Sequence, residues 1–274
     1  MASARNNHRH RRGRGRLGPL FKLLCVLAVI VALTMGATVF FQVETVAVSG
    51  NSRYTEEDVV HATGIQTGDN LYRMNKNQIA QQVLQKLPYI KELTIRRSLP
   101  STIVITVTEW DAVARVAAPA PGTVVSAEEG EENPPEVARE DWLISVGGKL
   151  LEPAPADSTA ILVSGITPLM PRAGTILKVP QKEQAKYDAL LSLLAELERL
   201  DMMDRVSSVE LGSTQVLMRY EERFAVKMLL NADFNYKLRT LEAAVPNAEE
   251  RFGDQTSGTF DLTQEQYQAI YSPD

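Results

Sequence analysis

One uncharged apolar stretch constrains this chain more than any other feature of its sequence. Nineteen consecutive residues, Leu23–Phe41, contain neither a charged side chain nor a proline. A helix needs about 20 apolar residues to cross the hydrocarbon core of a bilayer, and Lys22 can extend its amine to the interface at one end. The sequence therefore predicts a transmembrane helix at 23–41, preceded by a basic tail at 1–22.

A cleaved signal peptide is the alternative to a permanent anchor. The apolar region of a secretory signal is shorter, about 7–15 residues, and ends at a site of small residues. Here Ala37 is followed by bulky residues at 39–41, and Leu24 instead of a small residue precedes Cys25. These residues disfavour both a signal-peptidase site and a lipoprotein site. We therefore interpret the stretch as an uncleaved signal anchor.

The charge of the chain divides at this stretch. The net charge is −5, but the first 41 residues carry seven Arg or Lys side chains and no acid, so the head has +7 and the rest −12. Basic residues next to a span stay in the cytoplasm. We expect a single-pass type II protein of the cell membrane, with an extracytoplasmic body. Nucleic-acid binding is an alternative for the run Arg11–Arg16, but topology and anionic lipids explain its charge without nucleic acid.

The body offers few residues for catalysis or metal binding. Cys25 is the only cysteine of the chain, and His61 is the only histidine outside the basic tail. A single Cys forms no internal disulfide or zinc cluster, and any His-dependent site in the body would have to use His61. The body also lacks the phosphate-loop, nucleophile-elbow and zinc-protease motifs. We expect no catalytic residues, no cofactor, no metal and no nucleic-acid partner.

The first part of the body, residues 42–111, has the pattern of one small α+β domain. The β-branched run Val43–Ser49 predicts a strand. A short helix follows, because Thr55 can cap its first turn with Asp58 in the third position. Gly64 ends this helix.

A second helix and two strands complete this pattern. Apolar residues at helical spacing, Ile79, Val83, Leu84 and Leu87, predict an amphipathic helix that stops at Pro88. The runs 90–96 and 102–109 are strands, and a turn joins them at 99–101. The expected order is therefore β-α-α-β-β.

Four short motifs accompany this order. They are VxVxGN at Val46–Asn51, a loose GxNL at Gly68–Leu71, LPYI at Leu87–Ile90 and LPSTIVITVTEW at Leu99–Trp110. Together with the basic tail and the single span, they resemble the POTRA domain of the FtsQ/DivIB cell-division proteins. In that family the POTRA domain follows a single membrane span immediately, as it does here.

Residues 112–140 differ in composition from the sequence on either side. The stretch 117–140 is rich in Pro, Ala and Glu, and it contains four Glu within 128–132. Low hydrophobicity and like charge favour an extended or disordered segment. The sequence leaves open whether this segment is a linker or a long loop within a second domain.

A second mixed α+β domain, with an antiparallel sheet and helices, is expected over 141–274. The pattern predicts a hairpin at 142–151, strands at 161–165, 206–211, 215–220, 223–230 and 259–262, and helices at about 181–200 and 234–245. The leucine stripe of the longer helix suits packing on a sheet, and a coiled-coil partner is the alternative. This order resembles the second, β domain of FtsQ/DivIB, so the whole chain is expected to be of the α+β class.

The resemblance implies a scaffold of the division complex that works by binding and is not an enzyme. Its implied partners are DivIC/FtsB-like and FtsL-like proteins and, through them, the septal peptidoglycan synthase. The implied location is the division septum. Two alternatives stay open: a membrane-anchored cell-wall enzyme, and a POTRA-type chaperone.

The resemblance also implies a binding site, because the last strands of the β domain dock the DivIC-like partner in this family. A sheet edge can accept a partner strand through its backbone hydrogen bonds. Phe260 and Leu262 also suit core packing. The matching candidate residues are Gly258, Thr259, Phe260, Asp261, Leu262 and Tyr267.

Overall fold

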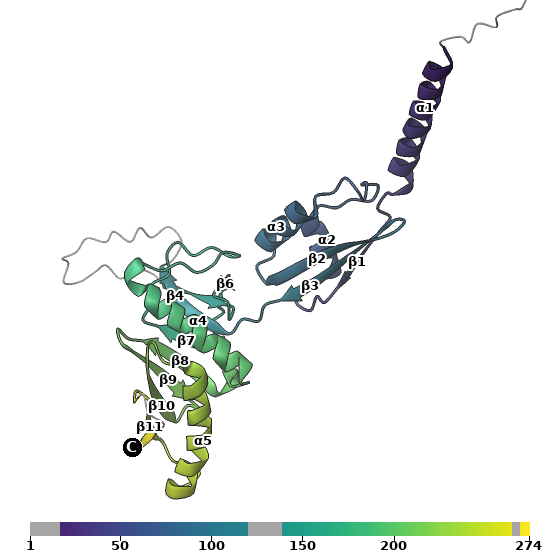
Figure 1. Cartoon of the computed structure of the whole chain (residues 1–274). Helices are drawn as coiled ribbons and strands as arrows, with labels where there is room; N and C mark the ends of the chain where they lie inside the picture. Colours follow the sequence, from purple (N-terminus) through teal and green to yellow (C-terminus); the bar gives the residue numbers. More distant parts are fainter. Residues whose placement is uncertain (1–16, 120–138, 265–268) are drawn as a thin grey trace, which may run out of the picture.

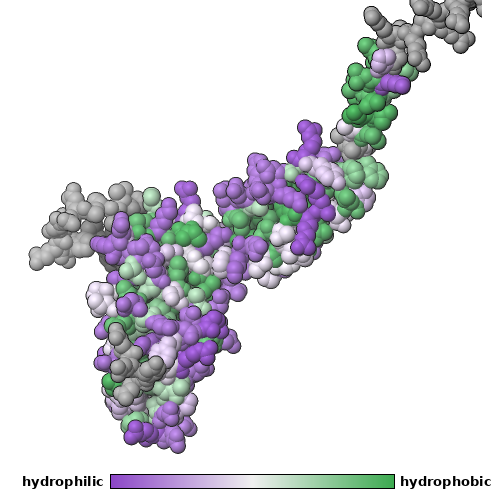
Figure 2. Space-filling model, in the orientation of Figure 1, coloured by the Kyte–Doolittle hydropathy of each residue, from purple (hydrophilic) through white to green (hydrophobic). Residues whose placement is uncertain are grey.

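The computed structural model describes residues 17–119, 139–264 and 269–274, and it begins with one long helix. This helix, α1 (Leu17–Phe40), starts earlier than the predicted residue 23, because Pro19 falls in the first turn, where a helix tolerates proline. Its window Pro19–Gly36 is long and apolar enough to cross a membrane, and none of the window is buried. Figure 2 shows it as an apolar rod that projects from the rest of the molecule.

A three-stranded unit follows α1 and has the predicted β-α-α-β-β order (Figure 1). Its central strand β3 pairs in parallel with β1 and antiparallel with β2, so the sheet order is β1-β3-β2. Both helices lie on one face of this sheet (Figure 1). The elements are β1 (Thr45–Ser49), α2 (Glu56–Thr63), α3 (Lys76–Lys86), β2 (Ile90–Ser98) and β3 (Thr102–Glu109).

Local sequence signals set the ends of α2. Thr55 and Asp58 form the predicted capping box: the Thr55 hydroxyl accepts from the Asp58 amide, and the Asp58 carboxylate accepts from the Thr55 amide. Gly64 ends the helix at a φ of 70°, in the left-handed region that favours glycine. The predicted start and stop of this helix are therefore confirmed.

The second unit is a nine-stranded sheet with the order β12-β11-β10-β9-β8-β7-β4-β5-β6. The long helices α4 and α5 cover one of its faces (Figure 1). The strands are β4 (Ala114–Pro119), β5 (Arg139–Ile144), β6 (Leu150–Pro153), β7 (Ile161–Ser164), β8 (Val206–Leu211), β9 (Gln215–Tyr220), β10 (Phe224–Leu229), β11 (Gly258–Asp261) and β12 (Ile270–Pro273). The helices are the short 3-10 turns η1 (Gln181–Glu183) and η2 (Met203–Arg205), α4 (Gln184–Arg199) and α5 (Phe234–Phe252).

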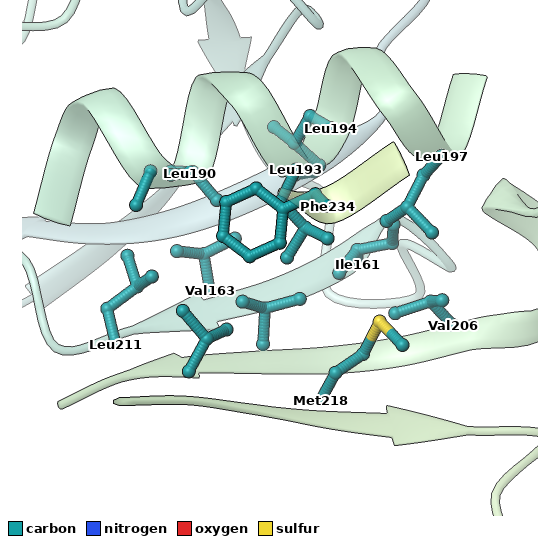
Figure 3. Close-up of a cluster of buried hydrophobic side chains, with 14 of the residues drawn as sticks. Ile161, Val163, Leu190, Leu193, Leu194, Leu197, Val206, Leu211, Met218 and Phe234 are labelled. Carbon is teal, nitrogen blue, oxygen red and sulfur yellow. The ribbon is translucent and has the colours of Figure 1, made fainter. Parts of the chain in front are cut away.

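The core of this second unit lies between the helices and the sheet. Leu190, Leu193, Leu194 and Leu197 are fully buried on α4. They point toward side chains of the sheet and toward Phe234 at the start of α5 (Figure 3). The leucine stripe is therefore used within the chain, as packing on a sheet requires.

The stretch 112–140, predicted as a linker or a long loop, contains strand β4 and the first residues of β5. β4 and β5 pair antiparallel, with Ala114 opposite Ile144 and Ala118 opposite Glu140. Ala114, Val116 and Ala118 are buried in the core of the sheet. β4 forms because small and branched apolar residues alternate along it. The high Ala and Pro content of the stretch obscured this alternation. Both strands belong to the nine-stranded sheet.

The helix predicted to stop at Val245 continues through Pro246 to Phe252. Proline removes one helical hydrogen bond, but it is exposed here and contacts on both sides keep the helix going. Ala248 is buried in the next turn, and Glu249 forms an ion pair with Arg223. Tertiary contacts therefore override the local signal to stop.

The three-stranded unit and the nine-stranded sheet contact each other through polar groups and through an apolar cluster around Tyr89. Lys149 is only 8% exposed, and its amine donates hydrogen bonds to the carbonyl of Ile90 at 3.0 Å and that of Leu84 at 3.5 Å. Glu152 on β6 accepts hydrogen bonds from Arg53 at 2.6 Å and from the Tyr89 hydroxyl at 2.7 Å. Lys149 and Glu152 of the second unit thus both bind the first unit.

Candidate partner-binding site

The candidate residues lie on or directly after β11, with one exception. β11 contains residues 258–261, and Leu262 follows it. Tyr267 lies outside the described residues. β11 pairs in parallel with β10 on one side and antiparallel with β12 on the other. Both edges of β11 are therefore occupied within the sheet, and an incoming strand has no free edge to pair with at these positions.

Phe260 and Leu262 belong to the core, since each is only 1% exposed. The Phe260 ring lies 5.1 Å from the ring of Phe224 and 4.7 Å from that of Tyr271, measured between centroids. Aromatic pairs at such distances add to the stability that burial already gives. These rings join three strands, β10, β11 and β12, into one packed layer.

Gly258 permits the close approach of β12. A Cβ atom at this position would lie 2.4 Å from the carbonyl oxygen of Ser272 and 3.0 Å from the Cα of Pro273. Any side chain would therefore push the two strands apart. The glycine that the sequence marks as a binding residue acts here by placing its neighbour strand.

Asp261 serves the turn that follows β11. Its carboxylate accepts hydrogen bonds from the Thr263 hydroxyl at 2.6 Å and from the Thr263 amide at 2.9 Å. These two bonds lower the pKa of Asp261 below its ordinary value, because they stabilise the charged form. The carboxylate therefore stays ionised and occupied by its own loop, which is a structural role. Thr259, the remaining candidate, is half-buried on the same strand.

β12 is a strand that the sequence pattern does not predict. It has only four residues, and its Pro273 lowers the strand propensity of an already short run. Proline inside a strand is itself a sign of an edge, because it cannot donate to a neighbour. Among the residues that the structure describes, β12 pairs with β11 alone, so its outer edge is open.

A groove runs beside this edge, between β12 and the second half of α5. It has a volume of about 490 Å³. Ile270 is 47% exposed and Phe252 is 51% exposed along it, so it offers apolar surface to a partner. The lining side chains come from Thr240, Ala243, Ala244, Asn247, Ala248, Arg251 and Phe252 on α5, Phe260 on β11, and Ala269, Ile270 and Tyr271 around β12.

Tyr271 fixes the floor of the groove. Its hydroxyl donates to the carbonyl of Ser257 at 2.9 Å and lies 2.6 Å from the hydroxyl of Thr256. Its ring lies 5.4 Å from that of Phe252. The hydroxyl of Tyr271 therefore has hydrogen-bond partners, while its ring packs against Phe252 of α5. Amphipathic aromatic residues are used in this way at interfaces.

A charged cluster fixes the end of α5 that forms one wall. Arg223 binds Glu249 of α5 at 2.5 Å and Glu221 at 2.7 Å, and Glu221 also pairs with Arg205. Arg223 further donates to the carbonyl of Asp254 at 2.7 Å, just past the helix. Although partial burial raises the pKa of Glu221, hydrogen bonds from the two arginines outweigh it and lower that pKa. Ion pairs and a hydrogen bond thus hold this end of α5 in place.

His61, the only histidine of the body, is exposed in the last turn of α2. It lines a shallow groove with Glu56 and Glu57, on the three-stranded unit and away from β11 and β12. The structure does not bring it together with any of the candidate residues on β11.

Comparison with known proteins identifies the three-stranded unit. Residues 41–110, which contain all five of its elements, match the family described as the POTRA domain, FtsQ-type. The chain carries an FtsQ-type POTRA domain. The predicted POTRA order and the predicted α+β class are therefore confirmed.

Similar curated proteins bear the names that the sequence suggested. The cell division protein FtsQ of Corynebacterium glutamicum is 34% identical over 88 residues, which cover 31% of this chain and 39% of that protein. The cell division protein DivIB of Clostridium acetobutylicum is 33% identical over 74 residues, 27% of this chain and 29% of that protein. FtsQ of Streptomyces coelicolor is 32% identical over 98 residues, 33% and 37% of the two chains. The resemblance to FtsQ/DivIB is confirmed, and the matches span less than two fifths of each relative.

Proposed function

We propose that this protein is a membrane-anchored scaffold of the bacterial division machinery. One observation supports this most: an FtsQ-type POTRA domain directly follows a helix long and apolar enough to cross a bilayer. Similar proteins named FtsQ and DivIB are cell division proteins. The protein acts at the septum, where the division machinery assembles.

The anchor has a type II topology in this proposal. The seven basic residues before and at the start of α1 stay in the cytoplasm, and the POTRA domain and the nine-stranded sheet lie outside. The acidic body then faces the extracytoplasmic space, where its partners are also anchored.

The outer edge of β12 is where the partner binds. A partner strand from a DivIC/FtsB-like protein adds to this edge through backbone hydrogen bonds, and its apolar side chains enter the groove beside α5. FtsL-like proteins and the septal peptidoglycan synthase join through that partner. Open edges are otherwise a liability in soluble proteins, and the exposed Ile270 and Phe252 beside this one fit a covered surface.

The scaffold acts by binding and not by catalysis. The acid that the sequence singled out, Asp261, is held by Thr263. Two carboxylates of the cluster that holds α5, Glu221 and Glu249, are engaged by arginines. These groups support a rigid binding surface.

Substitution of Ile270 tests the binding site. Ile270→Glu places an unpaired charge on the edge and in the groove, and we expect capture of the organism's DivIC/FtsB-like protein to fall by about tenfold or more, the loss of about 1.4 kcal/mol expected of a central apolar contact. The measurement is co-purification of the full-length chain with that partner from membranes.

A matched control separates binding from folding. Ile176 is 55% exposed and bridges to Lys149 at the other end of the sheet, so we expect Ile176→Glu to leave capture unchanged. Equal capture of the partner by the wild type, Ile270→Glu and Ile176→Glu would contradict binding at the outer edge of β12. Loss of a wall-cleaving activity in place of partner capture would favour the anchored enzyme, and a bound unfolded outer-membrane protein would favour the chaperone.

A further inference from the structure

Two exposed apolar side chains lie at the end of the POTRA domain next to α1. Tyr72, in the loop before α3, is 55% exposed, and Leu99, in the turn between β2 and β3, is 56% exposed. Neither contributes to the POTRA core or to the partner groove. Both side chains therefore expose apolar surface at the same end of the domain.

The loop that carries Tyr72 is bound to the first residues after α1. The Leu71 amide donates to the Phe41 carbonyl at 3.0 Å, and the Val43 amide donates to the Asp69 carbonyl at 2.8 Å. The rings of Phe41 and Tyr72 pack edge to face at 5.2 Å. The loop therefore stays within reach of the point where the chain leaves the helix.

The turn that carries Leu99 lies at the same end. The Glu44 amide donates to the Ser101 carbonyl at 2.9 Å, and the Ser101 hydroxyl donates to the Glu44 carboxylate at 2.8 Å. Thr45, the first residue of β1, pairs with Thr102, the first of β3. Figure 1 shows this turn beside the lower end of α1.

At this end the arginines Arg73, Arg96 and Arg97 outnumber the acids Glu44 and Asp69. Arg73 and Arg96 are exposed. Arg97 donates to the Leu71 carbonyl at 2.5 Å and lies over the Tyr72 ring at 5.5 Å, so it fixes the loop. The acids there are engaged: Glu44 accepts from Ser101, and Asp69 accepts from the Gln66 amide at 2.9 Å.

We propose that Tyr72, Arg73, Arg96 and Leu99 form an anchor-proximal face that rests on the phospholipid headgroups of the membrane. This inference rests on the proposed membrane anchor, because α1 must span the bilayer for its end to lie at the headgroup level. Amphipathic aromatic rings prefer that level. Basic side chains there are attracted to anionic lipids, and long ones place their charge among the headgroups.

The face has a consequence for the rest of the body. The POTRA domain is joined to the nine-stranded sheet through Lys149 and Glu152. If lipid contact fixes the tilt of the POTRA domain, it also fixes the direction in which the open edge of β12 points. The membrane thereby helps to present the partner site.

Spin labels on the full-length chain test the contact with lipid. In a Cys25→Ser background, which removes the only native cysteine, labels go to Tyr72→Cys, Leu99→Cys and, as a control, Glu250→Cys on the exposed side of α5. The chain is reconstituted in phosphatidylcholine bicelles with and without phosphatidylglycerol. Collision rates with oxygen, which concentrates in lipid, and with a nickel chelate, which stays in water, are then measured.

We expect the ratio of oxygen to nickel collisions at 72 and 99 to exceed that at 250 by about threefold or more, as interfacial side chains require. In bicelles with phosphatidylglycerol, Arg73→Glu with Arg96→Glu lowers the population in lipid contact by about fivefold or more. The matched reversal on the second unit, Arg172→Glu with Arg239→Glu, leaves it unchanged.

Three results would overturn the inference, and they are distinguishable. Labels at 72 and 99 that are as open to nickel as the label at 250 show that no lipid contact exists while the anchor stands. Equal protection after charge reversal shows that the arginines have no part in it. A chain that does not co-elute with bicelles shows that α1 is not a membrane anchor, and this result also contradicts the proposed function.

Discussion

At the scale of single residues, Glu221 links the turn in which it lies to the sheet and, through Arg223, to helix α5. Glu221 and Glu222 have positive φ angles of 49° and 59° in the three-residue turn, 221–223, between β9 and β10. β9 and β10 pair antiparallel across this turn. The Glu221 carboxylate then binds Arg205 and Arg223, and Arg223 holds Glu249 of α5.

We predict that Glu221→Gln destabilises the fold by about 1 kcal/mol at pH 7, as loss of a networked ion pair does. The folded pKa of Glu221 is lowered from 4.5. Its stabilisation is therefore present above pH 4.5 and is lost as the pH falls through the folded pKa. Urea unfolding from pH 7 to pH 3 should show the wild-type advantage disappear.

The exposed neighbour Glu222 provides the control, since Glu222→Gln keeps the turn and its charge lies outside the arginine cluster. It should unfold like the wild type across the same pH range. A gap between Glu221→Gln and the wild type that stays constant down to pH 3 would refute the electrostatic role.

At the scale of elements, the place of β12 depends on the missing side chain at Gly258. We predict that Gly258→Ala displaces β12, because its Cβ would lie 2.4 Å from the Ser272 carbonyl oxygen. Overpacking of this kind costs about 1–3 kcal/mol. Partner capture should then fall as it does for Ile270→Glu, although residue 258 does not reach the open edge.

Hydrogen exchange of the amides of β12 checks this prediction directly. Their exchange should accelerate in Gly258→Ala and stay slow in Thr259→Ala, which changes the next residue of the same strand without adding an atom near β12. Unchanged protection of β12 in Gly258→Ala would show that the strand does not need the glycine.

The elements differ in how far the sequence predicts them. Helix α2 follows from Thr55, Asp58 and Gly64, because caps act within a few residues of the chain. β12 and the far half of α5 depend on contacts with β11 and Arg223, which are distant in sequence. For the same reason the sequence pattern predicts strand β11 but not the open edge of the sheet, because it does not show the order in which the strands pair.

At the scale of the whole molecule, α1, the POTRA domain and the nine-stranded sheet follow one another in space as in the sequence (Figure 1). Lys149 joins the last two units through hydrogen bonds. Its amine lies among carbonyl oxygens, and burial lowers the pKa of Lys149. Nothing in the sequence marks this lysine, because its acceptors belong to the other unit.

We predict that Lys149→Met loosens the two units. The change leaves the carbonyls of Leu84 and Ile90 without their donor, which costs about 1–3 kcal/mol. Pulsed-dipolar distances between labels on α3 and α5 should broaden, whereas the exposed Lys178→Met should leave them narrow. Distances that stay narrow in Lys149→Met would show that the apolar contacts around Tyr89 suffice.

The central claim, that this POTRA protein is an anchored division scaffold, predicts where it is found. The most direct test is the position of a fluorescent fusion to the N-terminus of the full-length chain in dividing cells of its own host. The account predicts a band at midcell that appears with constriction and weakens in Ile270→Glu. A uniform membrane signal, or a signal free of the membrane, in cells that are visibly dividing would contradict it.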